Sequence, residues 1–401
     1  MSPASERSAR LVLVFACLGH AWFHVLTALF LTLVLLLEPA WQRPYDELIA
    51  LWTLGALMLG LGAPLAGWCS DRWGETRVMV ACYLGMGLGV IACGLATGPL
   101  SLKLALALVG LFGAIYHPVG TAWVVKNAKA RGKAIGILGV CGGLGAAAAS
   151  LVAGGLGDWL GWRAAFAIPG VLSLLLGLAL LALYLGSVVL DRDSDLAAQV
   201  EPKSREVRRA FMVLALTMSL TSVVYYAFTT MLPKWLESEI GERLGDGIFG
   251  LGVMVSAIYL VATFAQLIGG HLADRGSAKT VYVVSYALKL AALLLAAELG
   301  GWQVVMIAIV VLFMFDVGAP VENVLIARFT PNRRRGLAYG IRNGIAIVAA
   351  PLGVQLVAWL FDPQAGFAPL LFVLAGLVGV VLLAALMLPG ERGKADCAAA
   401  C

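Results

Sequence analysis

Twelve apolar runs alternate with short polar segments along this 401-residue chain, and each run is long enough to cross a bilayer as a helix. About 20 apolar residues span the hydrocarbon layer of a membrane. The predicted spans are residues 11–37, 48–69, 78–96, 102–124, 132–156 and 164–186 in the first half, and 210–235, 247–272, 280–299, 304–327, 336–360 and 367–388 in the second. The pattern predicts an all-α membrane protein.

One segment near the middle of the chain is too polar to span. Residues 187–209 are rich in Asp, Glu, Lys and Arg, and we interpret them as a cytoplasmic linker. The predicted domains are therefore an N-terminal six-helix bundle (1–187), the linker (188–209) and a C-terminal six-helix bundle (210–401) with a short cytoplasmic tail.

The two halves repeat one another. Residues 67–74 (GWCSDRWG) recur as residues 270–276 (GHLADRG), which places Asp71 and Asp274 at an offset of 203 (274 − 71). The segments 131–136 and 335–340 match at 204 (335 − 131), and His117-Pro118-Val119 matches Ala319-Pro320-Val321 at 202 (319 − 117). Three anchors at nearly one offset indicate duplication of a six-span unit, as in many transporters.

Composition supports a membrane protein and excludes other classes. The chain is 61% hydrophobic and 13% charged, with a mean hydropathy of +0.93, whereas a soluble domain is nearer one quarter charged. The net charge of +5 comes from short loops, so it does not indicate nucleic-acid binding. Most of these basic residues fall on one side if the amino terminus is cytoplasmic, which predicts that both termini are cytoplasmic. The first run has no cleavage site and is interpreted as a span.

The 67–74 loop and its repeat resemble the most diagnostic motif of the major facilitator superfamily, and the likeness covers essentially the whole chain. A closer likeness is to bacterial fosmidomycin-resistance-type exporters. Those carry two histidines in the first span, like His20 and His24, and an aromatic-His-Pro sequence in the fourth, like Tyr116, His117 and Pro118. The resemblance implies a monomer in the bacterial inner membrane. It also implies two pseudo-symmetric bundles around a cavity that spans 1, 4, 7 and 10 mainly line, with alternating access.

The two Asp-Arg loops are candidates for a conformational gate. The predicted gate residues are Gly67, Asp71, Arg72, Gly74, Gly270, Asp274 and Arg275. By family likeness, Asp71 would approach the start of span eleven, and Asp274 the start of span five, where the positive end of a helix favours a carboxylate. The alternative is a solvated turn whose charge only sets topology.

Polar groups at depth are candidates for substrate or proton binding, because charges inside spans are costly and usually face a cavity or a partner. His20 and His24 are four residues apart and share one face of span one. The full predicted set is His20, His24, Tyr116, His117, Tyr225, Tyr226, Asp316, Glu322, Asn323, Arg342 and Asn343. The alternative is that they are ordinary core residues.

Two further charges lie within spans. Glu322 and Arg342 lie at similar depth on adjacent spans, which predicts an ion pair, either as structural glue or to hold an anionic substrate. Lys289 on the peripheral span nine is expected to pair or to extend to the interface.

These features predict a secondary transporter that is coupled to protons and moves a small polar or anionic organic solute. Efflux follows from the closer family likeness and is preferred. Uptake symport is the alternative, since the Gly142–Gly155 stretch of span five lacks the Gly-Pro pair of the antiporter signature. A non-transporting membrane sensor is a third reading. Sodium coupling stays open.

No enzyme activity, cofactor or metal site is expected. The chain has no phosphate-binding Gly-x-x-x-x-Gly-Lys-Ser/Thr loop and no Cys-x-x-Cys pair among its seven cysteines. His20 and His24, with the sequence-distant His117, could bind a metal, but no acid within span one completes such a site.

Overall fold

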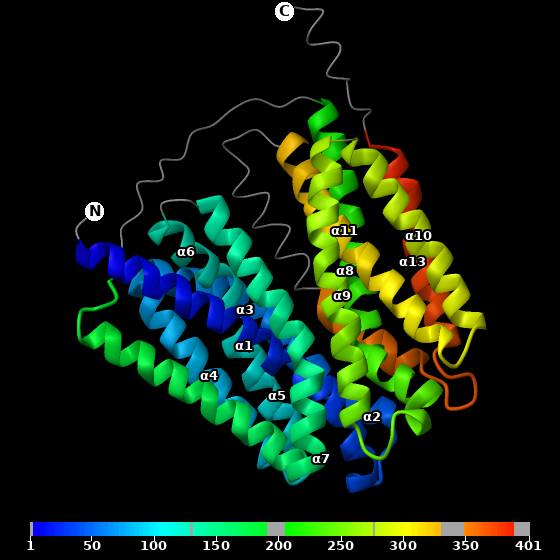
Figure 1. The fold of residues 1–401 in the computed structure, drawn as a ribbon, viewed down its shortest axis with the longest axis horizontal. Coiled ribbons are helices and arrows are strands. Elements are labelled where there is room, and N and C mark those ends of the chain that lie inside the picture. Colours follow the sequence, from blue (N-terminus) through cyan, green and yellow to red (C-terminus); the bar gives the residue numbers. More distant parts are fainter. Residues whose placement is uncertain (1–2, 129–130, 191–204, 276, 330–348, 389–401) are drawn as a thin grey trace, which may run out of the picture. The chain divides into compact units, whose positions relative to one another are not determined.

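The computed structural model describes residues 3–128, 131–190, 205–275, 277–329 and 349–388, and this part of the chain is almost entirely helical (Figure 1). The first half contains α1 (Pro3–Trp41), α2 (Tyr45–Ile49), α3 (Trp52–Trp73), α4 (Glu75–Gly94), α5 (Pro99–Gly113), η1 (Tyr116–Gly120), α6 (Thr121–Asn127) and α7 (Arg131–Leu185). The second half contains α8 (Arg205–Ile240), η2 (Gly241–Arg243), α9 (Phe249–Arg275), α10 (Ala278–Glu298), α11 (Gln303–Phe329) and α13 (Ala368–Leu386).

The predicted spans correspond to helices wherever the chain is described; residues 336–348 of predicted span eleven lie outside the described part. Within the described residues, 10 helices are long and apolar enough to cross a membrane, and a shorter apolar helix covers Ala349–Leu360. One of the ten lies in α7 and contains both predicted spans five and six. A kink at Gly161 separates the two spans, and the backbone angles there (φ 81, ψ 161) favour glycine. The all-α membrane fold is confirmed.

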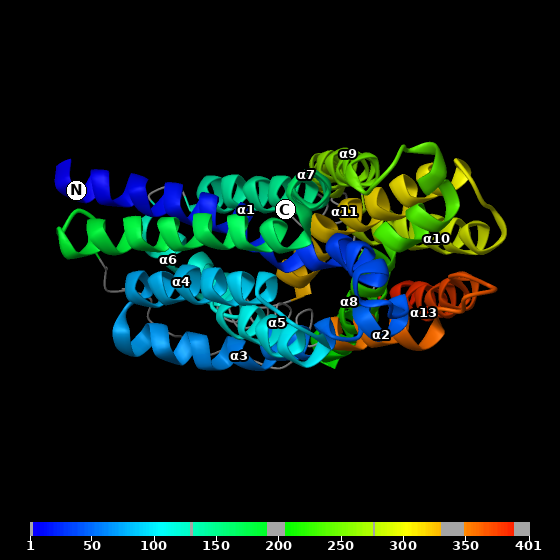
Figure 2. The same cartoon turned by 90° about the horizontal axis from the view of Figure 1, so that it is seen from below.

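The first compact unit comprises Met1–Leu196, Tyr226–Leu260 and Ile347–Phe367. Both α1 and α4 pack along α7, and α3 packs on α5 (Figure 2). Glycine permits the closest of these approaches. A Cβ on Gly145 would lie 2.1 Å from the carbonyl oxygen of Ala21, and a Cβ on Gly110 would lie 1.9 Å from that of Gly55. Small residues at such crossings are typical of helix packing within membranes.

The second compact unit comprises Ala197–Tyr225, Val261–Ala346 and Ala368–Cys401. Its α10 packs against both α11 and α13. The buried face of α10 includes Tyr282, Tyr286 and Lys289, at a spacing of four and then three residues. Such a spacing places side chains on one face of a helix, so this unit has polar groups in its interior.

Candidate functional site

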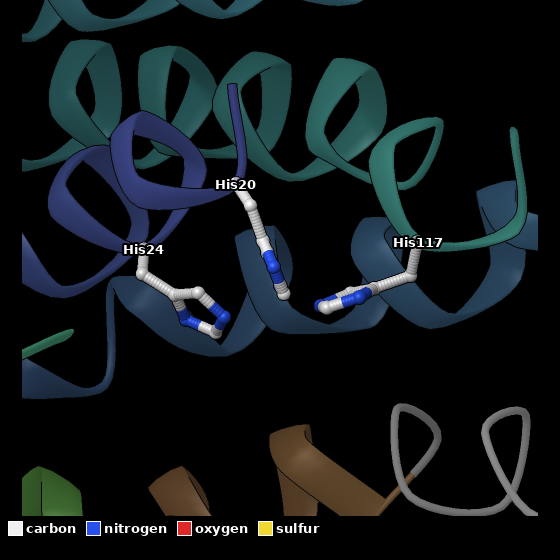
Figure 3. Close-up of side chains that lie close together, drawn as sticks. All are labelled: His20, His24 and His117. Atoms are coloured by element: carbon white, nitrogen blue, oxygen red, sulfur yellow. The ribbon is translucent and has the colours of Figure 1, made fainter. Parts of the chain in front are cut away.

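Three histidines from two helical segments form a cluster in the first unit (Figure 3). His20 and His24 project from successive turns of α1, and His117 comes from η1. The ring centroid of His20 lies 5.0 Å from that of His24 and 5.4 Å from that of His117, and the His24 and His117 centroids are 5.7 Å apart. The structure therefore brings together residues that are almost 100 positions apart in the sequence.

A local break in the helix positions His117. Residues 116–120 (YHPVG) form a π-helical turn between α5 and α6. Pro118 has no backbone N–H to donate, which disturbs ordinary α-helical hydrogen bonding. Short π-helical turns of this kind are frequent at functional sites.

Contacts from α7 orient the His20 ring. Its Nδ1 lies 2.7 Å from the carbonyl oxygen of Leu138. A carbonyl can only accept, so Nδ1 carries the hydrogen, and in the neutral ring Nε2 is then left with a lone pair. That Nε2 atom is buried and has no hydrogen-bond partner in the described part of the chain. Gly142 makes room for the ring, because a Cβ there would lie 2.5 Å from His20 Cε1.

Aromatic rings line the cluster. The Tyr116 ring stacks on His20 with centroids 5.0 Å apart, and Phe23 lies 4.8 Å from His117 by the same measure. The Tyr116 hydroxyl donates to the carbonyl oxygen of Ala16, which holds the ring against α1. The predicted residue Tyr116 is therefore a buried wall of the cluster, and its own hydroxyl is already engaged.

A different polar network lies inside the second unit. Glu322 on α11 is buried, and its Oε1 lies 3.0 Å from the Tyr282 hydroxyl. Tyr282 Oη is also 3.1 Å from Thr217 Oγ1, and the Tyr286 hydroxyl lies 2.6 Å from Thr221 Oγ1. These bonds connect α8, α10 and α11. Sequence reasoning missed both tyrosines, although their spacing on one face of span nine was a readable signal.

Lys289 neither extends to the interface nor lies at the edge of the unit. Its side chain is buried, with Nζ 3.4 Å from the centroid of the Tyr286 ring and 4.5 Å from that of Phe315. Contact with aromatic faces stabilises a desolvated cation. Lys289 is thus part of the interior polar network of the second unit.

The other predicted residues of the second half have more varied surroundings. Asp316 is half-buried on α11 and accepts a hydrogen bond of 3.1 Å from Gln266 Nε2. The Tyr225 ring centroid is 5.5 Å from that of Phe315, and Tyr226 is half-buried on α8. Asn323 lies on α11. Arg342 and Asn343 lie outside the described residues, so the Glu322–Arg342 ion pair stays a prediction.

The first Asp-Arg loop ends α3 at the surface. Asp71 and Arg72 are exposed, and Gly74 follows with φ 85, a conformation that favours glycine. Directly after it, the buried Glu75 forms an ion pair with Lys126 of α6, which sequence reasoning missed. Among the described residues, and apart from the backbone of its own helix, no heavy atom lies within 4 Å of a Cβ built on Gly67.

The second loop follows the same plan at the end of α9. Apart from the backbone of the same helix, no other described residue has a heavy atom within 4 Å of a Cβ built on Gly270, and Asp274 and Arg275 form the last turn of the helix. The expected partner of Asp71, near Gly336, lies outside the described residues. The gate function of both loops therefore stays a prediction.

Polar contacts also tie the ends of several helices within the first unit. Lys234 Nζ lies 2.8 Å from Glu38 Oε2 and 3.1 Å from Glu237 Oε2. The Asp158 carboxylate accepts hydrogen bonds from the backbone N–H groups of Ile248 (2.9 Å) and Phe249 (2.6 Å) at the start of α9. A carboxylate is favoured at this positive end of a helix. These contacts fix segments of the second half against the first.

Comparison with protein families decides the classification. The model of the Major Facilitator Superfamily matches residues 17–247 and 239–398. The chain belongs to the Major Facilitator Superfamily. The family and fold indicate a transporter of small molecules in a membrane. The finer likeness to fosmidomycin-resistance-type members stays a prediction.

Relatives of this superfamily member include both resistance proteins and carriers of organic acids. The chain is 26% identical to the 3-(3-hydroxy-phenyl)propionate transporter of Escherichia coli K12 over 357 residues, which covers 87% of each protein. It is 23% identical to the class H tetracycline resistance protein of Pasteurella multocida, covering 86% of this chain and 85% of that one. A multidrug resistance protein B homolog of Mycobacterium tuberculosis is 30% identical over 157 residues, but the match spans 28% of that protein's length.

Solved structures support the superfamily fold. A bacterial homolog of the human lysosomal transporter Spinster, inward-facing and occupied, aligns with a TM-score of 0.74 at 17% identity, covering 97% of this chain and 95% of that one. A D-xylose–proton symporter aligns with a TM-score of 0.74 at 17% identity, covering 96% and 98%. At such identities the likeness concerns the fold.

Proposed function

We propose that this protein is a proton-coupled secondary transporter that moves a small polar or anionic organic solute by alternating access. The observation that carries the proposal is the cluster of His20, His24 and His117 within a Major Facilitator fold. Imidazoles are suited to exchange protons near neutral pH. Groups of this kind inside a membrane bundle commonly mark the paths of protons and substrates.

Carboxylates of the second unit complete the proposed coupling machinery. Asp316 is half-buried and bonded to an amide, and Glu322 is buried beside a tyrosine hydroxyl. We infer that Asp316 binds and releases the coupling proton, while the Glu322 network holds its helices in register or contacts an anionic solute through Arg342. The exposed Asp71 on α3 and Asp274 in the last turn of α9 serve as latches on the cytoplasmic side in this scheme.

The relatives bear on direction and solute. The resistance proteins favour efflux, which is the direction we propose for the bacterial inner membrane, with both termini cytoplasmic. The second candidate is uptake symport of an organic anion. It is favoured by the 3-(3-hydroxy-phenyl)propionate transporter, which matches along most of its length, and by the absence of proline from residues 142–155.

Proton-flux measurements in liposomes test the proposal. The purified protein is reconstituted in sodium-free vesicles containing a pH-sensitive dye, and 3-(3-hydroxy-phenyl)propionate, cis,cis-muconate and tetracycline are added in turn. We expect one class of solute to move protons, a protonophore to abolish accumulation, and D316N to transport without dependence on the pH gradient.

Two outcomes contradict the proposal. Full accumulation against a gradient in sodium-free vesicles that lack a pH difference would exclude proton coupling. A correctly folded protein that moves none of a broad panel of organic solutes would favour the sensor. The sign of proton movement relative to solute movement separates efflux antiport from uptake symport.

A further inference from the structure

We propose that His20, His24 and His117 form a binding site for a divalent transition metal, with Zn²⁺ as the representative ion. One nitrogen from each ring would bind the metal, and a fourth position would stay open. The sequence argument against a metal was that no acid within span one completes a site with His20, His24 and the distant His117. The structure brings His117 of η1 beside the other two, and three imidazoles can bind zinc without an acid.

The distances suit this assignment. One ring nitrogen from each histidine can be chosen so that all three lie within 4.8 Å of one another. In a tetrahedral zinc site with Zn–N bonds of about 2.0–2.1 Å, ligand nitrogens lie about 3.4 Å apart. Small rotations of the rings therefore close the site. Figure 3 shows the three rings converging on one region.

The orientation of His20 provides a second, independent argument. Its Nδ1–H donates to the carbonyl oxygen of Leu138, which leaves a lone pair on a buried Nε2 that has no hydrogen-bond partner among the described residues. Metal-binding histidines typically donate their other N–H to a backbone carbonyl or a carboxylate, which sets the tautomer and the ring orientation. His20 already has this arrangement, and a metal would satisfy the unused nitrogen.

The ligand chemistry narrows the choice of ion. Three neutral imidazoles favour Zn²⁺, Ni²⁺ or Cu²⁺ over Mg²⁺ or Ca²⁺, which prefer oxygen ligands. Three histidines with an open fourth position also match the ligand set of catalytic zinc sites, although we assign no catalysis here.

Metal and protons compete for the same nitrogens. A histidine must be neutral to bind a metal, so affinity falls as the pH is lowered. If the cluster also handles protons, as the proposed function holds, a bound metal inhibits transport. Binding itself does not depend on that function, so the two proposals fail separately.

Spectroscopy with Co²⁺ tests the site directly. The full-length protein is purified in detergent through an affinity tag without histidine, and Co²⁺ is titrated while the visible absorbance of four-coordinate cobalt is recorded. Zn²⁺ is then added to displace it. We expect one Co²⁺ per chain, displaced by Zn²⁺, and weaker binding at acidic pH.

Variants identify the ligands. H24A and H117A should weaken Co²⁺ and Zn²⁺ affinity on the order of 100-fold, since loss of even a residue that supports a ligand costs 10–100-fold. H271A is the matched control, because His271 is exposed on α9 and is the one remaining histidine of the chain's four. Equal binding by the wild type and the H24A/H117A double variant would overturn the proposal. Absence of binding by a monodisperse wild-type protein would do so too.

A measurement on the wild type covers the case in which a variant fails to fold. Diethyl pyrocarbonate modifies accessible imidazoles, and mass spectrometry resolves the peptides. We expect Zn²⁺ to protect His20, His24 and His117 and to leave His271 reactive. Equal reactivity of the cluster with and without Zn²⁺ contradicts the site.

Discussion

The two halves of the chain carry repeated motifs, but the two compact units differ in their interior chemistry. The first unit has three imidazoles and the aromatic rings of Phe23 and Tyr116 at its polar centre. The second has a carboxylate, Glu322, hydrogen-bonded to Tyr282, with the Lys289 amine nearby. At the offset of 203, His20 corresponds to Val223 (20 + 203), so the repeat does not preserve the histidines. The repeat therefore preserves sequence motifs, whereas the interior chemistry of the two halves differs.

A pair of equivalent prolines illustrates the same difference. Pro118 lies in the π-helical turn η1, directly after His117. Its counterpart Pro320 lies within α11, which continues as an α-helix on both sides. The repeat therefore preserves the residue but not the local backbone. In the first unit, the π-helical turn at Pro118 places the titratable His117 beside α1.

We expect the largest loss of stability when a hydrogen bond of the second unit's polar network is removed. Y282F removes a hydroxyl that bonds to a carboxylate and should lower the free energy of unfolding by about 2 kcal/mol, since bonds to charged groups contribute more than neutral ones. In the first unit, Y83F removes a neutral bond of 2.9 Å to the carbonyl oxygen of Phe15. It should cost about 1 kcal/mol. Thermal unfolding in detergent compares the two, and equal losses would contradict the distinction.

A somewhat smaller effect tests the packing around the first unit's cluster. G142A places a Cβ against the His20 ring, which can move aside, so we expect a loss of about 1–2 kcal/mol in stability together with weaker Co²⁺ binding. G139A is the control on the same helix, because, apart from the backbone of that helix, no other described residue has a heavy atom within 4 Å of a Cβ at that position. It should be neutral or slightly stabilising. Unchanged Co²⁺ affinity in G142A would argue against the described orientation of His20.

The smallest effect compares the two repeated loops. A carboxylate near a helix amino end contributes about 1 kcal/mol, so D71A should slow transport on the order of fivefold while membrane insertion is unchanged. D274A should have an effect of similar size if the repeat preserves the gate. D362N is a control at another exposed loop aspartate. Rates equal to those of the wild type in D71A would leave the loop with a role in topology alone.

The sequence by itself determined the helical spans, their duplication and the family, because these depend on local composition and on motifs that are readable in order. It also placed His20 and His24 on one face of a helix, since that follows from helical periodicity. It singled out Glu322 and Asp316 because charge within an apolar run is rare.

Only the tertiary structure decided which side chains of other helices contact these residues. The contact between His117 and His24, and the hydrogen bond from His20 to Leu138, 118 residues away, depend on how α1, η1 and α7 pack. The same holds for Tyr282, which the sequence did not single out, and for Lys289, which the sequence predicted to pair or to extend to the interface. Helical periodicity predicts which residues share a face of one helix. A polar site also requires the packing of several helices, which brings their polar faces into contact.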